Sequence, residues 1–206
     1  MFHIGLTGSI GAGKSTVSSY LKKCGYIVLD ADQTVHDLYE QDSFLKMFEK
    51  EFGREFLDEE GLIDRRELSK GVFEDEAMRK RLNRLVHPLV IRRLFEEASS
   101  CGRDKVIYDV PLLFETKMDL YMDAIIVVVS EEELSKKRVQ LRDKRSRWEV
   151  DKIFDRQLSQ EEKIKKADFV IRNDSSLEQL FLKIDEMLPE LDRFLKRIKE
   201  KKEELK

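Results

Sequence analysis

The stretch "GSIGAGKST" (residues 8–16) constrains the fold of this chain more than any other feature. It follows the apolar run "FHIGLT" (2–7) and opens the amphipathic run "KSTVSSYLKKCG" (14–25). Gly8, Gly13, Lys14 and Ser15 occupy the defining positions of the pattern GxxxxGK(S/T). A segment so rich in glycine cannot form a packed core, but its backbone can wrap closely around a ligand. The pattern therefore predicts a strand, a phosphate-binding loop and a helix in immediate succession.

The chemistry of this loop suits a nucleoside triphosphate. Successive backbone N–H groups turn inward toward phosphate, and the following helix aims its positive end at the same place. Lys14 can reach the β- and γ-phosphates, and the Ser15 hydroxyl can ligate Mg²⁺. We therefore expect ATP and Mg²⁺ as ligands, with a preference for ATP over GTP left open. The residues expected to bind ATP here are Gly8, Gly11, Ala12, Gly13, Lys14, Ser15 and Thr16.

Five short β-rich runs indicate the fold class. Their apolar residues are continuous rather than alternating, which is typical of parallel strands buried on both faces. Helical patterns lie between them, as in a three-layer α/β domain. The expected strands are residues 2–7, 26–30, 105–110, 123–129 and 168–173.

Two insertions interrupt the alternation of strands and helices. Residues 42–52, 64–72 and 75–100 are expected to be helices, with Pro88 restarting the last one after His87. We therefore expect an inserted helical lobe over 33–103. A basic insertion over 131–166 is expected to be a small helical lid. The nucleotide-binding core then comprises residues 1–32, 104–130 and 167–206.

The composition excludes several other classes of protein. The 206 residues carry 39 Lys and Arg against 42 Asp and Glu, so the concentrated basic face of a nucleic-acid-binding protein is not expected. No apolar stretch reaches the ~18 residues of a membrane span. Cys24 and Cys101 fit no disulfide or metal spacing, which favours a reducing compartment. We expect a cytoplasmic protein, monomeric by default, with an oligomer left open.

Two aspartates follow the second expected strand, in "YIVLDAD" (26–32). Ligands of α/β proteins bind at the carboxyl ends of strands. A carboxylate there could accept the proton of an attacking hydroxyl, or it could only cap the next helix. We predict that Asp30 is the cap and that Asp32 is the catalytic base.

Three more charged residues are candidates for the site. Asp109 ends the run "KVIYD" (105–109), where a second acidic residue could hold Mg²⁺ with Ser15; a turn aspartate before Pro111 is the alternative. Arg138 and Arg142 lie four residues apart, on one helical face. The pair could close over the triphosphate and bind ATP, with Arg142 neutralising the transferring charge, or it could form a solvated surface.

Several other classes of nucleotide-binding protein have the same loop. A GTPase needs a guanine-reading NKxD-type segment, which the chain lacks. A motor ATPase usually needs a longer chain and an arginine finger from another subunit. Another nucleoside or nucleotide kinase stays open, as does a non-catalytic module that uses nucleotide as a switch. The candidate base Asp32 and the basic insertion argue against the switch.

The motifs in order resemble those of dephospho-coenzyme A kinases over about residues 1–185. The matching segments are "GLTGSIGAGKSTV" (5–17), "LDAD" with His36 (29–36), "VHPLV" (86–90), "DVPLLFE" (109–115), "QLRDKRS" (140–146), "DRQLSQEEK" (155–163) and "ADFVIRND" (167–174). The chain departs from the family in its denser Lys and Arg around 136–147 and in a helix that continues after Pro189.

The resemblance implies a P-loop kinase fold with a five-stranded parallel sheet, in which the helical lobe over 33–103 binds the acceptor, dephospho-CoA. It also implies transfer of the γ-phosphoryl group of ATP to the 3′-hydroxyl of the dephospho-CoA ribose. By the same match Asp32 is the general base. Lys14 and Arg142 are also expected to be catalytic, and which lid arginine contacts phosphate is left open. The residues expected on the acceptor side are Asp32, His36, His87, Leu112, Leu113 and Phe114.

Overall fold

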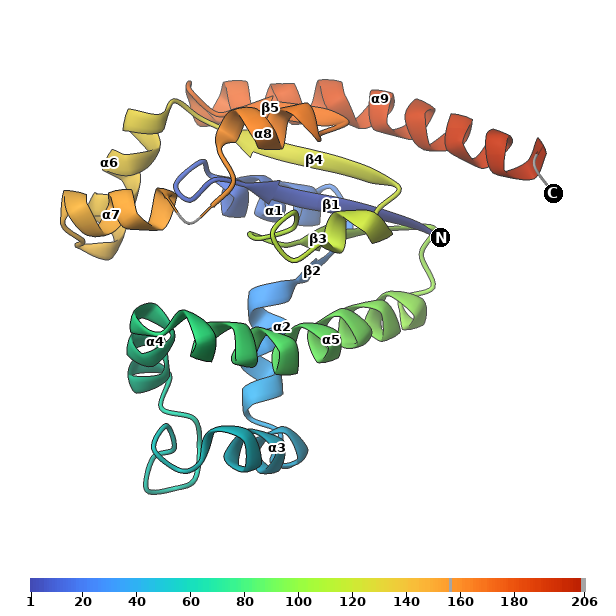
Figure 1. Cartoon of the computed structure of the whole chain (residues 1–206). Coiled ribbons are helices and arrows are strands. Elements are labelled where there is room, and N and C mark those ends of the chain that lie inside the picture. Colours follow the sequence, from blue (N-terminus) through green and yellow to red (C-terminus); the bar gives the residue numbers. More distant parts are fainter. Residues whose placement is uncertain (156, 205–206) are drawn as a thin grey trace. The chain divides into compact units, whose positions relative to one another are not determined.

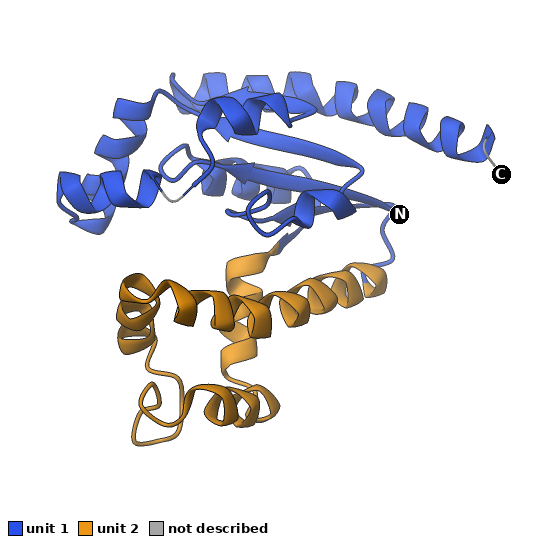
Figure 2. Cartoon of the chain, in the orientation of Figure 1, with its two compact units in different colours: residues 1–29, 101–206 blue, residues 30–100 orange. Residues whose placement is uncertain are grey.

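The computed structural model describes residues 1–155 and 157–204. These residues divide into two compact units, drawn in different colours in Figure 2. The first unit comprises residues 1–29 and 101–206, and the second comprises residues 30–100. The basic insertion over 131–166 therefore belongs to the same unit as the glycine-rich loop.

The first unit is built on a five-stranded sheet with the order β2-β3-β1-β4-β5 (Figure 1). β1 pairs in parallel with β3 and β4, and β4 pairs in parallel with β5. The α/β fold with a parallel sheet is as predicted, and each strand end lies within one residue of its expected position. The strands are β1 Phe2–Gly8, β2 Ile27–Asp30, β3 Lys105–Asp109, β4 Ala124–Val129 and β5 Phe169–Arg172.

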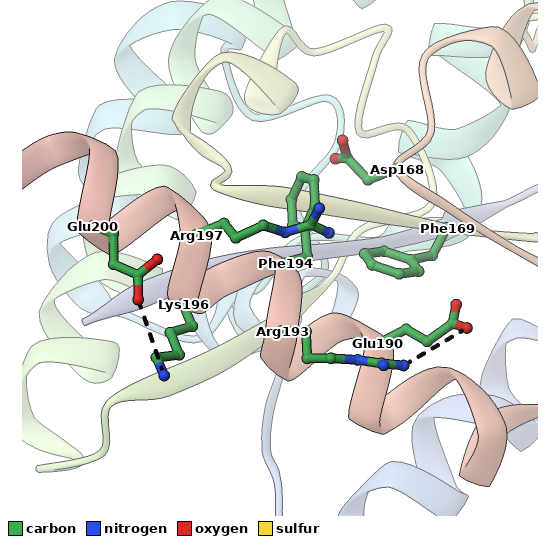
Figure 3. A pocket seen from close by; sticks show the side chains of 8 residues that line it. All are labelled: Asp168, Phe169, Glu190, Arg193, Phe194, Lys196, Arg197 and Glu200. Atoms are coloured by element: carbon green, nitrogen blue, oxygen red, sulfur yellow. Dashed lines mark ion pairs between the residues drawn. The ribbon is translucent and has the colours of Figure 1, made fainter.

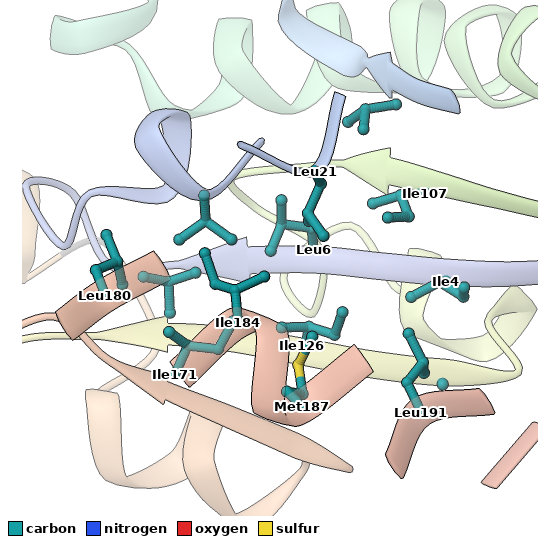
Figure 4. Close-up of a cluster of buried hydrophobic side chains, with 14 of the residues drawn as sticks. Ile4, Leu6, Leu21, Ile107, Ile126, Ile171, Leu180, Ile184, Met187 and Leu191 are labelled. Carbon is teal, nitrogen blue, oxygen red and sulfur yellow. The ribbon is translucent and has the colours of Figure 1, made fainter. Parts of the chain in front are cut away.

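One apolar cluster joins the sheet to two helices, α1 (Lys14–Lys23) and α9 (Leu177–Glu204). Its strand residues include Ile4 and Leu6 of β1 and Ile126 of β4, as Figure 4 shows. Burying each such side chain contributes about 1.5–3 kcal/mol. This packing holds the start of α1 at the end of β1, which fixes both sides of the glycine-rich loop.

The segment after β3 packs on the other face of β1, opposite to the face covered by α1 and α9. Gly5 alternates with Ile4 and Leu6 along the strand and so points to the other face of the sheet. A Cβ atom at Gly5 would lie 2.8 Å from Leu113 Cδ2, which shows how closely that side chain approaches. Beyond it lies a short 3₁₀ helix, η1 (Met118–Tyr121), whose Met118 is buried.

The basic insertion forms three helices, α6 (Glu132–Asp143), α7 (Arg147–Phe154) and α8 (Gln160–Lys165). Ser146 and Ser159 each begin a helix with a complete capping box. Several basic side chains are paired with acids of the same insertion: Lys136 lies 2.6 Å from Glu132 and 2.8 Å from Asp151. Much of the positive charge is therefore neutralised locally.

A single tryptophan lies on α7. Trp148 is 62% exposed, and Lys152 Nζ lies 3.7 Å from the centre of its ring. A cation over an indole face is a favourable pair. The ring therefore has a charged neighbour but little protein cover.

The second unit consists mainly of helices, with one isolated antiparallel bridge between Leu57 and Ile63 in the loop after the second of them. Its helices are α2 (Ala31–Tyr39), α3 (Asp42–Phe52), α4 (Arg65–Glu74) and α5 (Glu76–Ser100). A row of buried phenylalanines, Phe44, Phe48 and Phe52, gives α3 its core-facing side. The expected helix restart at Pro88 is wrong: α5 runs through it, because buried Val86 and Val90 hold both flanking turns in place.

Across the part of the chain that the structure describes, no helix is both long and apolar enough to cross a membrane.

Candidate active site

The glycine-rich loop has a conformation that few other residues could adopt. Gly11 and Gly13 have φ angles of +78° and +92°, in the left-handed region where only glycine is at ease. A Cβ atom on Gly11 would lie 2.4 Å from the Ser135 carbonyl oxygen, and one on Gly13 would lie 2.1 Å from Asn173 Nδ2. At both positions the loop therefore needs glycine, because of the backbone angle and because there is no room for a side chain.

Helix α1 begins directly from this loop with an open N-terminus. Its N-cap is Gly13, which has no side chain with which to cap the helix, and its first turn contains no acidic residue. The N–H groups of a first helical turn lack partners within the helix, and they carry the positive end of the helix dipole. An anion such as phosphate fits this end of the helix.

Lys14 and Asp109 form a buried ion pair at the edge of the sheet. The Lys14 ammonium donates to Asp109 Oδ1, and Asp109 is only 3% exposed. Asp109 is the last residue of β3 and lies in register beside Leu6 of β1, so the sheet itself brings the two charges together. The lysine of the loop and the acidic residue at the strand end thus occupy one site.

The donors at this site fit a magnesium ion. Mg²⁺ prefers oxygen ligands and is usually held by one or two protein oxygens together with substrate phosphates. Ser15 is exposed at the start of α1, and Asp109 supplies a carboxylate beside the same loop. The Ser15 hydroxyl and the Asp109 carboxylate are thus the groups that would hold the ion.

Asn173 clamps the loop and was not singled out from the sequence. It follows β5, is 6% exposed and donates from Nδ2 to the Ala12 carbonyl at 2.8 Å. Its backbone carbonyl accepts from the Arg138 guanidinium at 3.1 Å. The side-chain NH₂ group thus binds the loop while the main-chain carbonyl binds Arg138, so this residue connects α6 to the backbone of the loop. Only its place in "ADFVIRND" could have pointed to it.

The two predicted arginines differ in their surroundings. Arg138 reaches Asn173 and also the Ser130 hydroxyl at 3.3 Å, so it lies one residue away from direct contact with the loop. Arg142, one turn further along α6, is 62% exposed at its side chain and makes two hydrogen bonds to its neighbour Asp143, at 2.7 and 2.9 Å. Arg138 is therefore built into the site, whereas Arg142 is held at the surface.

The two aspartates after β2 also differ. Asp30 is the N-cap of α2 and accepts from the N–H groups of Asp32 and Gln33, at 2.9 and 3.2 Å. This confirms the capping role expected for Asp30. Asp32 lies in the first turn of α2, so its carboxylate is not used as the cap.

Two histidines of the second unit were expected on the acceptor side. On α2, His36 Nδ1 lies 3.2 Å from Glu40 Oε1 without the geometry of a hydrogen bond. His87 lies in the middle of α5 and is half-buried. Burial lowers the pKa of His87 below its usual value of 6.5, which favours the neutral ring.

The three residues of "LLF" after β3 have unequal access to solvent. Leu112 is 41% exposed, whereas Leu113 is fully buried and Phe114 nearly so. Leu113 packs on Gly5, and Lys166 lies over the Phe114 ring at 5.3 Å. Of the three, Leu112 alone presents a substantial surface, so the contact with the acceptor expected of Leu113 is not available in this structure.

A groove of about 660 Å³ lies elsewhere, between the start of β5 and α9 (Figure 3). Its charges are largely paired, as in Arg193 with Glu190 and Lys196 with Glu200, both at 4.0 Å. It opens at the amino end of β5, whereas ligands of parallel sheets bind at the carboxyl ends. This groove is therefore not the site that holds phosphate.

The parallel sheet, the glycine loop after β1 and the Lys14–Asp109 pair together define a P-loop kinase. Solved structures agree on the fold: a shikimate kinase from Acinetobacter baumannii superposes with a TM-score of 0.54 at 17% identity, covering 92% of this chain and 94% of that one. The family model of the dephospho-CoA kinases matches residues 2–179. The chain belongs to the dephospho-CoA kinase family.

Individual relatives agree with this assignment. A dephospho-CoA kinase of Fusobacterium nucleatum is 46% identical over 183 residues, covering 88% of this chain and 94% of that protein. One from Campylobacter jejuni, of known structure, has a TM-score of 0.67 at 29% identity, covering 92% and 98%. The Thermus thermophilus protein TT1252 has a TM-score of 0.82 at 36% identity, covering 92% and 97%.

Proposed function

We propose that the chain transfers the γ-phosphoryl group of ATP to the 3′-hydroxyl of the dephospho-CoA ribose, giving coenzyme A and ADP. Membership of the family over residues 2–179 supports this reaction. The observation that carries it is the open N-terminus of α1 beside the Lys14–Asp109 pair. Phosphoryl transfer demands alignment and neutralisation of charge more than covalent chemistry by the protein, and this arrangement supplies both.

The residues of the first unit would act on the triphosphate. The backbone of Gly8–Thr16 cradles the phosphates, and Lys14 exchanges its contact with Asp109 for one with the β- and γ-phosphate oxygens. When bound, Mg²⁺ would lie on the Ser15 hydroxyl and Asp109 and would supply neutralisation of phosphate charge. Arg138 orients the loop through Asn173, and Arg142 would leave Asp143 to meet the transferring group.

Residues of the second unit and of the segment after β3 would act on the acceptor. Asp32 is the general base that orients the ribose hydroxyl and takes its proton. His36, His87 and Leu112 would contact the acceptor, with Leu113 and Phe114 supporting that segment from beneath. We also propose that the protein is cytoplasmic and monomeric.

The reaction is tested by measuring ADP release from ATP with dephospho-CoA, with AMP or with no acceptor. ADP release specific to dephospho-CoA, with the product phosphate at the 3′ position, is expected. Release with AMP alone would indicate another nucleotide kinase. Nucleotide binding without release under any of the three conditions would indicate a switch module.

The role of Asp32 is tested with a matched pair of variants. Asp32→Asn should lower kcat about 10²–10⁴-fold, the usual range for a general base, and leave ATP affinity nearly unchanged. Asp30→Asn removes one charge from the same turn but keeps a good helix cap, so its kcat should stay close to that of the wild type. Equal losses in the two variants would rule out Asp32 as the base.

A further inference from the structure

A fully buried lysine lies close to the phosphate loop. Lys163, on α8, has no exposed side-chain surface. A buried ammonium is costly unless it is paired and hydrogen-bonded, so its contacts are expected to matter. The cation of the phosphate loop is Lys14, so Lys163 is not needed for that role.

The contacts of Lys163 lead directly to the loop. Its Nζ lies 3.4 Å from Gln157 Oε1, and the same oxygen accepts from the backbone N–H of Ile10 at 3.2 Å. Ile10 is the third residue of "GSIGAGKST". One carboxamide oxygen thus connects a buried cation with the first turn of the phosphate loop.

The orientation of the Gln157 carboxamide follows from its partners. An ammonium and a backbone N–H can only donate, so the oxygen, and not the NH₂ group, must face both. Turning the amide over would place donors against donors at both contacts. Without the lysine, the Ile10 N–H would be the remaining partner of this half-buried side chain among the residues that the structure describes, and a single hydrogen bond contributes little to ordering.

Glu115 keeps the lysine in place. Its Oε1 lies 3.6 Å from Lys163 Nζ and accepts from the Leu158 N–H at 2.9 Å. Burial lowers the pKa of Lys163, and the neighbouring Glu115 opposes that shift. The Glu115 carboxylate therefore balances the charge of the buried lysine. It also holds the backbone of Leu158, the residue next to Gln157, so that Lys163 and Glu115 together fix this short segment.

We propose that Lys163 is a positioning residue for nucleotide binding: through Gln157 it holds the Ile10 N–H, and with it the first turn of the phosphate loop, ready for the triphosphate. This inference rests on the proposed kinase function for its purpose, but not for its test. Misplacing a group by an ångström can lower the rate of an enzymatic reaction as much as about a hundredfold. The role is distinct from catalysis, because Lys163 touches the loop only through another side chain.

The test is a double-mutant cycle on the full chain, read by calorimetric titration with Mg·ATP. Gln157→Met and Lys163→Met remove the polar contacts at similar volume, and Lys165→Met, on the exposed side of α8, is the matched control. We expect the Kd for ATP to rise about tenfold in each of the first two variants, the scale of one lost ordering hydrogen bond. In the double variant the rise should be no larger than in Gln157→Met alone, since the two residues act in series.

Kinetics separate positioning from a merely structural role. A smaller folded fraction would lower the apparent kcat and leave both KM values unchanged, whereas positioning should raise the KM for ATP and keep the KM for dephospho-CoA within about twofold. If Lys163→Met leaves Glu115 unpaired and the protein unfolds, Lys163→Met with Glu115→Gln removes the orphaned charge. Gln157→Met tests the same link on a half-buried residue.

Two results would overturn the proposal. One is an ATP Kd in Gln157→Met or in a folded Lys163 variant equal to that of Lys165→Met. The other is additive losses in the double variant, which would mean that the two residues act separately. Failure of the wild type to phosphorylate dephospho-CoA would instead count against the proposed function, because the calorimetric readout needs no acceptor.

Discussion

At the scale of single residues, the phosphate loop is held by contacts that leave no room for substitution. Asn173 Nδ2 bonds to the Ala12 carbonyl and fills the space where a side chain on Gly13 would lie. The same glycine is the N-cap of α1. Gly13 therefore serves three needs, since its backbone angle, its lack of a side chain and its place before the helix are all required.

A pair of glycine variants separates backbone strain from loss of space. Gly25 has a φ angle of +87°, close to that of Gly13, but a Cβ atom there would meet nothing within 4 Å. Gly25→Ala should therefore cost only the left-handed strain, about 1–2 kcal/mol, and leave ATP binding intact. Gly13→Ala should cost more stability in urea unfolding and weaken ATP binding in titration. Similar ATP affinities in the two variants would mean that the Asn173 contact does not shape the loop.

The residues of the site that could be predicted are those marked by a sequence motif or by the end of a strand. Lys14 and Asp109 were predictable because a motif and a strand end place them at one edge of a parallel sheet. Asn173, Gln157 and Lys163 lie in the matching segments 155–163 and 167–174, but no residue spacing predicts how they connect to the backbone of the distant loop. Arg142 lies on the expected helical face, but in this structure its guanidinium donates to the adjacent Asp143 carboxylate.

At the scale of elements, α9 does more than close the chain. The family model ends at residue 179, yet Ile184, Leu191 and Leu195, further along the same helix, are buried against the sheet. Pro189 lies inside this helix despite a cost of about 3 kcal/mol for proline in a helix interior. The burial of apolar side chains on either side of it offsets that cost.

The contribution of this extension is measurable with two leucine variants. Leu191→Ala should lower the free energy of unfolding by about 2–5 kcal/mol, because it leaves a cavity in the core. Leu182→Ala, on the same helix but 59% exposed, should change it by less than about 0.5 kcal/mol. Urea unfolding followed by circular dichroism gives both values. A loss below 1 kcal/mol for Leu191→Ala would show that the helix beyond residue 179 does not stabilise the core.

The positions of the elements were largely predictable, and the exceptions have a physical cause. Continuous apolar runs located all five strands, and α3 occupies the range expected of it. The helix break predicted at Pro88 is absent from α5. The prediction considered only the local cost of proline in a helix, whereas the burial of Val86 and Val90 is a tertiary effect that the local sequence does not show. Helix periodicity likewise could not show which basic residues of 131–166 would be neutralised by acids of another helix.

At the scale of the whole molecule, two compact units share one chain with a net charge of −3. Each has its own buried cluster, around Ile4 and Leu6 in the first unit and Phe44 and Phe48 in the second. Stability therefore has contributions that can be examined in each unit separately. The half-buried His87 provides such a handle in the second unit.

The stability of the molecule should fall in mild acid partly through His87. Burial lowers its pKa below 6.5 in the folded chain, so the unfolded chain binds the proton more tightly. This contribution to stability is fully present above about pH 6.5 and is lost as the pH falls through the folded pKa. His87→Gln should therefore lose less unfolding free energy than the wild type between about pH 8 and about pH 5. Parallel curves for the two proteins would show that His87 does not titrate differently on unfolding.

The chain's lone indole, Trp148 of α7, makes the basic insertion optically distinct. Its emission can be excited selectively over the five tyrosines, and its largely uncovered ring, with Lys152 above it, makes that emission sensitive to anything that displaces the ammonium or dries the surface. Fluorescence during a nucleotide titration would thus report on this one helix, without an attached dye.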